Sequence, residues 1–96
     1  MNTVRFLGEE CNVEFGQYVN GRIAIDLICQ TGERMARATV NDDMPSLADD
    51  EVAIKDYSEN AGMLKALQAA GVVGEPLRYI ASGFVQIPIC RLLVRP

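Results

Sequence analysis

The sequence predicts an α+β fold: one small domain over residues 1–96, with an antiparallel sheet of about five strands and one helix packed on it. The chain has 96 residues, a length that suits a single hydrophobic core. Most of its apolar side chains alternate with polar ones, as they do in strands that bury one face. One segment, about residues 57–70, has apolar residues at helical spacing instead.

The N-terminal part of the chain is predicted to form strands joined by short turns. Alternation indicates strands at 3–7, 11–15, 22–29 and 34–40. The dipeptide Asn20-Gly21 predicts a tight turn before the third of these, because both residues tolerate positive φ at low cost. The last two strands are the clearest hairpin, since a short turn containing glycine joins two alternating runs.

The C-terminal part alternates between loop, strand and helix. Residues 41–50 contain a proline and four aspartates and are predicted to form a loop. A short strand at 51–55 precedes the helix, and strands at 77–81 and 84–94 follow it. Pro88 has no amide hydrogen, so we expect its strand at a sheet edge or at a bulge.

The helix is predicted from its capping residues and its apolar stripe. Asp56 and Glu59 have the spacing of a capping box with Asp56 as the N-cap residue. Ser58 and Asn60 are alternative caps, which would start the helix later. Gly71 suits the position after the last turn, where a left-handed conformation is needed. A helix this short needs tertiary packing. The stripe that would pack on the sheet is Met63, Leu64, Leu67 and Ala70.

Composition excludes several kinds of catalytic and metal site. The chain contains no histidine, which removes Ser-His and Cys-His nucleophiles and Cys/His zinc sites. No glycine pattern matches a phosphate-binding loop, and the carboxylates lack the spacing of a calcium loop. We therefore expect no catalytic residue, no metal and no cofactor, and we expect that the protein is not an enzyme.

Cysteines and apolar runs indicate the compartment. Cys11, Cys29 and Cys90 are too few for a four-thiolate metal site and lack the C-x-x-C spacing of a redox dithiol. We expect Cys29 and Cys90 in the core and Cys11, which follows two glutamates, nearer the surface. The N-terminus lacks the apolar segment of a secretory signal, and no apolar run approaches the ~20 residues that span a bilayer. These features predict a cytoplasmic protein with reduced thiols and no membrane contact.

Negative charge is concentrated in the middle of the chain. The net charge is −4, but residues 42–59 carry seven carboxylates against one lysine. Such a block repels nucleic-acid phosphates and attracts a basic protein surface. Tyr57, like Tyr18 and Tyr79, combines a large ring with a polar tip, as interface anchors do. The alternative is a solvated loop whose carboxylates cap turns and the helix. The predicted partner-binding residues are Asp42, Asp43, Asp49, Asp50, Glu51, Asp56, Tyr57 and Glu59.

One motif carries a resemblance. The string Ile-Lys-Asp-Tyr-Ser-Glu-Asn occupies residues 54–60, and the segments that accompany it are 20–25, 38–41, 62–64 and 82–92. With these segments the chain resembles a family of small uncharacterised proteins encoded on bacterial plasmids, conjugative elements and phages. It departs from the pattern at Ala61, where glutamate is expected, and in the extra acidic pair of the loop before the motif. The resemblance brings no catalytic site, and it implies a mobile-element setting in which small proteins often block host defence.

Two functions are favoured over a third, an enzyme that uses carboxylates or a metal. The first is a non-catalytic protein-binding module that inhibits a host defence complex, as anti-CRISPR proteins do, by presenting its acidic residues to a basic groove that normally holds nucleic acid. The second is a self-associating structural or regulatory protein of a mobile element. Its homodimer seam would be the edge strand near Pro88 and the tail Leu92-Leu93-Val94. Direct binding of nucleic acid is not expected, because no basic run with interleaved aromatic residues is present.

Overall fold

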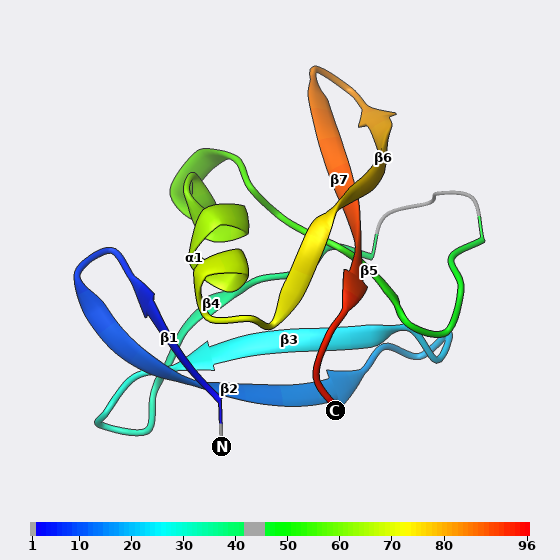
Figure 1. Ribbon diagram of the computed structural model, residues 1–96. Coiled ribbons are helices and arrows are strands. Elements are labelled where there is room, and N and C mark those ends of the chain that lie inside the picture. The colour runs from blue at the N-terminus through cyan, green and yellow to red at the C-terminus, as the bar shows by residue number, and fades with distance from the viewer. Residues whose placement is uncertain (1, 42–45) are drawn as a thin grey trace.

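The chain forms two antiparallel sheets with a helix between them, as Figure 1 shows for the computed structural model, which describes residues 2–41 and 46–96. The first sheet is a four-stranded meander in the order β1-β2-β3-β4. Because short turns join successive strands, neighbours in the sequence are also neighbours in the sheet. Its strands are β1 (Thr3–Phe6), β2 (Glu9–Gln17), β3 (Ile23–Ile28) and β4 (Arg34–Arg37).

The second sheet has three strands in the order β5-β7-β6. Its strands are β5 (Glu51–Ala53), β6 (Val73–Ser82) and β7 (Val85–Leu92). The last two form a long hairpin whose turn contains Gly83 with φ of 61°. In Figure 1 the free end of this hairpin rises away from the first sheet, so its outer half projects from the rest of the molecule.

The prediction of about five strands in one sheet is wrong, because the described residues contain seven strands in two sheets. The predicted strand at 34–40 divides. Its first part belongs to the first sheet as β4. Thr39 then forms an isolated antiparallel bridge with Ile54, the residue that follows β5 of the second sheet. Alternation shows which residues of a strand are buried, but it does not show which strand lies alongside. The broader prediction of a small α+β domain with mostly antiparallel strands and one helix is confirmed.

The helical segment is shorter than the expected 57–70. A 3₁₀ turn, η1 (Ser58–Asn60), is followed by the helix α1 (Met63–Ala69). Gly62 separates the two with φ of 96°, a left-handed conformation that glycine adopts at low cost. Gly71 also has positive φ, 73°, just beyond the helix end, as predicted. No helix among the residues that the structure describes is long and apolar enough to cross a bilayer.

Asp56 caps α1, although the register differs from the predicted capping box. Its carboxylate oxygen Oδ1 accepts hydrogen bonds from the backbone N–H groups of Gly62 at 3.1 Å and Leu64 at 3.0 Å. Asp56 therefore reaches the first turn of the helix from across η1. Glu59, the expected second member of the box, forms an ion pair with Lys55 instead.

The main hydrophobic core lies where the two sheets and α1 meet. Val4 and Ile25 enter it from the first sheet, Leu67 enters it from the helix, and Cys90 enters it from β7. A smaller cluster covers the opposite face of the second sheet and consists of the buried residues Ala53, Ile87 and Ile89. β7 is the central strand of its sheet, and it has buried residues on both faces.

Pro88 therefore does not lie on an edge strand, and the predicted dimer seam is not present as an edge. Its carbonyl faces the β5 side and accepts a hydrogen bond from Ile54 N at 3.0 Å. Pairing between β5 and β7 has already ended at Ala53 and Ile89, so the missing amide hydrogen interrupts no strand pairing there. In the tail, Leu92 is buried and Val94 packs against the core, while Leu93 is exposed.

Candidate interaction surface

The predicted acidic block does not form one continuous surface among the described residues. Asp49, Asp50 and Glu51 lie at the start of β5, whereas Asp56, Tyr57 and Glu59 follow the strand and surround η1. The segment between Glu51 and Asp56 is at most about 17 Å long, and the two groups pair with different basic residues of the chain. Asp42 and Asp43, the other predicted partner-binding residues, lie outside the described residues.

Arginines from the second sheet neutralise the first acidic group. Glu51 accepts two hydrogen bonds from the guanidinium of Arg78 at 2.9 Å each. These bonds, with a further one from the backbone N–H of Ala48, lower the pKa of Glu51 to about 2. Asp50 pairs with Arg91 at 3.1 Å on the surface. Within the described part of the chain, Asp49 is the carboxylate of this group that has no hydrogen bond or ion pair.

The second group is also engaged inside the molecule. Asp56 caps α1, and Glu59 pairs with Lys55. The ammonium of Lys55 lies 5.6 Å from the ring centroid of Tyr57, which itself packs against the smaller hydrophobic cluster. A basic partner would have to displace Lys55 to reach Glu59. The interpretation of the block as capping and solvated carboxylates therefore fits Asp56 and Glu59.

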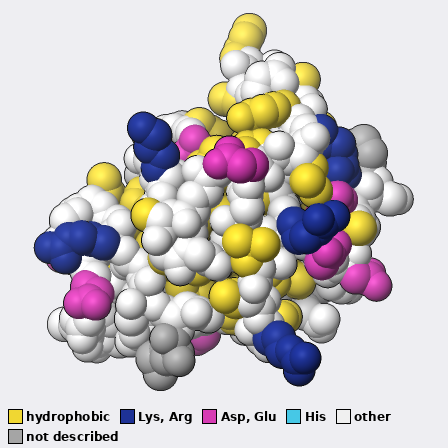
Figure 2. Space-filling view, viewed as in Figure 1, with side chains coloured by type: hydrophobic (Ala, Val, Ile, Leu, Met, Phe, Trp, Pro, Cys, Tyr) yellow, Lys and Arg dark blue, Asp and Glu magenta, His cyan; other side chains and the backbone are white. Residues whose placement is uncertain are grey.

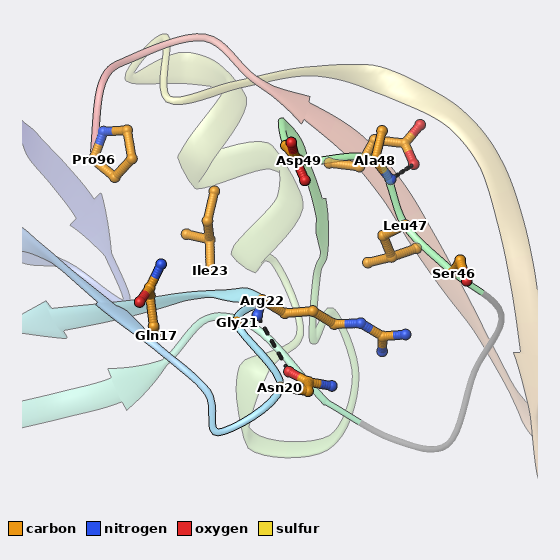
Figure 3. Close-up of a pocket in the computed structure, with 11 residues that line it drawn as sticks. Gln17, Asn20, Gly21, Arg22, Ile23, Ser46, Leu47, Ala48, Asp49 and Pro96 are labelled. Atoms are coloured by element: carbon orange, nitrogen blue, oxygen red, sulfur yellow. Dashed lines mark hydrogen bonds between the residues drawn. The ribbon is translucent and has the colours of Figure 1, made fainter.

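An open cavity of about 600 Å³ adjoins the first acidic group. Figure 3 shows it between the β2–β3 turn, which carries Asn20 and Arg22, and the segment before β5, which carries Leu47 and Asp49. The side-chain oxygen of Asn20 accepts a hydrogen bond from the backbone N–H of Arg22 and so shapes the turn. The lining is mainly polar and offers carboxylates beside one guanidinium. Over residues 2–41 and 46–96, no group of three or more His, Cys, Asp and Glu side chains is arranged to hold a metal ion.

Polar residues of the motif segments meet where the two sheets join. The hydroxyl of Tyr18 lies 2.9 Å from Oγ1 of Thr39, and that oxygen accepts a hydrogen bond from the backbone N–H of Ile25. Asn60 donates from Nδ2 to the backbone oxygen of Arg37 at 2.7 Å. The guanidinium of Arg37 lies 5.4 Å from the centroid of the Tyr18 ring. These contacts attach η1 to β4 and the segment after β4 to β3, so Thr39 and Asn60 have a structural role.

The β6–β7 hairpin exposes large apolar side chains that the predicted site residues do not include. Leu77 is 47% exposed, Tyr79 is 56% exposed and Phe84, beside the turn, is 109% exposed. In Figure 2 yellow side chains mark the projecting tip of the molecule. The sequence contained one signal for this surface, because Phe84 directly follows the turn dipeptide Ser82-Gly83. A large apolar side chain at such a turn is exposed unless another part of the molecule covers it.

The acidic residues and the hairpin are connected. Arg78 on β6 and Arg91 on β7 hold Glu51 and Asp50 beside the hairpin, whereas Tyr79, the next residue after Arg78 along β6, points to the opposite face of the second sheet. We call Leu77, Tyr79 and Phe84 the hairpin patch. Comparisons with protein-family models, with curated proteins and with solved structures find no match to this chain.

Proposed function

We propose that this chain is a non-catalytic protein-binding module from a mobile genetic element or phage, and that it inhibits a host defence complex in the cytoplasm, as anti-CRISPR proteins do. The observation that carries the proposal is the hairpin patch on the projecting β6–β7 hairpin. Exposed aromatic and aliphatic side chains on a projecting element are typical of residues that anchor protein interfaces. They would enter a pocket of the partner and supply the hydrophobic part of the affinity.

The acidic residues at the base of the hairpin would contact a basic surface of the partner. Asp49 has no partner within the described residues, and the Asp50–Arg91 pair is more than half exposed on both sides. An arginine or lysine of the partner can therefore pair with either carboxylate without breaking a buried contact. Such pairing accelerates association and weakens as salt is added, and the net charge of −4 has the matching sign.

Binding to a purified nucleic-acid-binding defence effector from the host tests the proposal. Tyr79→Ser and Phe84→Ser remove the anchors, and each is expected to weaken binding at least tenfold, which corresponds to about 1.4 kcal/mol. Val19→Ser is the matched control, because Val19 is 110% exposed on the β2–β3 turn, away from the hairpin. Equal affinities of the Phe84→Ser and Val19→Ser variants would exclude the hairpin patch as the contact. Absence of binding to every such effector at low salt would exclude the function.

Self-association is a second candidate, and the free edge of β6 favours it. β6 pairs with β7 on one side, and no strand of the described residues lies on its other side. The stretch Tyr79–Ser82 of this edge carries no charge and pairs regularly with β7, so it lacks the charged residues and bulges that usually protect an edge. Sedimentation at micromolar concentration distinguishes the two functions. A monomer removes the self-association candidate and leaves the binding module.

A further inference from the structure

Cys11 and Cys29 face each other across neighbouring strands. The last residues paired between β2 and β3 at this end are Asn12 and Ile28. The next opposed pair along the two strands is therefore Cys11 and Cys29. The two segments stay side by side beyond the cysteines, because the side-chain N–H of Gln30 donates a hydrogen bond to the backbone oxygen of Glu10 at 3.3 Å.

The backbone shows which type of pair they form. The N–H of Cys29 donates to Glu33 O at 2.8 Å, and its carbonyl accepts from Gly32 N at 2.9 Å, so both groups point to the β3–β4 turn rather than to β2. Cys11 and Cys29 are therefore a non-hydrogen-bonded pair, in which the Cα atoms are about 4.5 Å apart. Disulfides form at Cα separations of about 4.4–6.8 Å, and a non-hydrogen-bonded pair falls at the short end of that range.

The two thiols differ in reactivity. Cys29 is partly exposed, and its Sγ lies 3.0 Å from the hydroxyl of Thr31, which lowers the pKa of the thiol. Cys11 is completely buried, with its Sγ 3.3 Å from the sulfur of Met35, and burial raises its pKa. The expectation that Cys29 lies in the core and Cys11 nearer the surface is therefore wrong. Cys29 is thus the thiol that an external reagent meets first, and Cys11 is the neighbour that can react with it afterwards.

We propose that Cys29 and Cys11 form a thiol–disulfide exchange site for small disulfides of the glutathione type. The Cys29 thiolate attacks one sulfur of the small disulfide, whose S–S bond breaks and releases one thiolate, which takes up a proton. The Cys11 thiol then loses its proton and attacks the Cys29 sulfur, and the second small thiol leaves. Two protein thiols are oxidised to one cross-strand disulfide, while one small disulfide is reduced to two thiols.

The product would be reversible in a reducing compartment. A reduced small thiol that attacks the cross-strand disulfide runs the same exchange backward and restores both protein thiols. Cytosolic disulfides are usually transient and redox-sensing, so the site is compatible with the proposed cytoplasmic location. Oxidation would link β2 to the β3–β4 turn and fix the end of the first sheet. This inference stands independently of the proposed partner.

Peptide mapping of the full-length protein tests the site. The chain is treated with oxidised glutathione, free thiols are alkylated, and trypsin then places Cys11 in peptide 6–22 and Cys29 in peptide 23–34. The expected product is a covalent link between these two peptides that is lighter by two hydrogen atoms and is removed by a reductant. The third cysteine, Cys90, lies in peptide 79–91, which should carry neither glutathione nor a link and should be alkylated once the protein is unfolded, because Cys90 is completely buried.

Three variants separate the steps. In Cys11→Ala, glutathione should remain on peptide 23–34, because the resolving thiol is absent. In Cys29→Ser, which changes a partly exposed residue, peptide 6–22 should be alkylated only after unfolding. Cys90→Ala should form the same link as the wild type, and circular dichroism checks that each variant is folded. A wild-type protein that keeps glutathione on Cys29 without a link to Cys11, or that links peptide 79–91, overturns the proposal.

Discussion

Replacing Asp56 with alanine tests whether this carboxylate holds the fold rather than a partner. Its oxygen accepts two backbone N–H groups at the start of α1, from Gly62 at 3.1 Å and Leu64 at 3.0 Å. A hydrogen bond to a charged group contributes about 1.5–3 kcal/mol and a helix cap about 0.5–2 kcal/mol. Because the bond to Gly62 is exposed, we expect Asp56→Ala to lower the free energy of unfolding by about 2 kcal/mol. The melting temperature of a chain this size would fall by about 8–16 °C.

Urea unfolding followed by circular dichroism measures this change. Asp56→Asn keeps an oxygen acceptor and loses only the charge, so its cost should be about 1 kcal/mol. Asp49→Ala is the matched control, because Asp49 has no partner within the described residues, and its effect should stay within about 0.5 kcal/mol. If Asp56→Ala and Asp49→Ala have equal unfolding midpoints, the carboxylate does not cap the helix as described.

Three further predictions concern stability and the surface. The pKa of Glu51 is about 2 in the folded chain and about 4.3 when unfolded, so its contribution is present above the unfolded value and declines as pH falls toward the folded value. Glu51→Gln should flatten that decline in urea midpoints, and an unchanged slope contradicts the role of Arg78. Thr39→Val leaves a buried backbone N–H without its acceptor and should cost about 1–3 kcal/mol in the same assay, whereas no loss contradicts its structural role. Phe84→Ser should change stability by no more than about 0.5 kcal/mol, because the side chain is fully exposed, and a larger loss means that it packs inside the molecule.

Local features of the fold were predictable because they depend on nearby residues. Alternation over 22–29 gave a strand close to β3 (Ile23–Ile28), and Gly71 was expected just beyond the helix because positive φ favours glycine there. The role of Asp56 as a cap was also predictable from its residue type. Its register was not, because Gly62 interrupts the helical segment and moves the first turn of α1 away from Asp56.

Features that depend on distant contacts could not be read from the chain. Glu51 and Asp50 are neutralised by arginines 27 and 41 residues away, so their clustering in the sequence overstated the acidity of the surface. The division into two sheets depends on where the chain leaves β4, which alternation does not record. The opposition of Cys11 and Cys29 was accessible in principle, since a tight turn at Asn20-Gly21 sets the register of the hairpin.

The most direct test of the central claim is the plating efficiency of a phage that the host's defence system normally blocks. Cells expressing the wild-type chain should be infected as readily as cells without the defence. Cells expressing the Tyr79→Ser/Phe84→Ser double variant, folded and equally abundant, should remain protected. The claim is contradicted if the wild-type chain leaves infection blocked in every host tested, or if the double variant restores infection as well as the wild type.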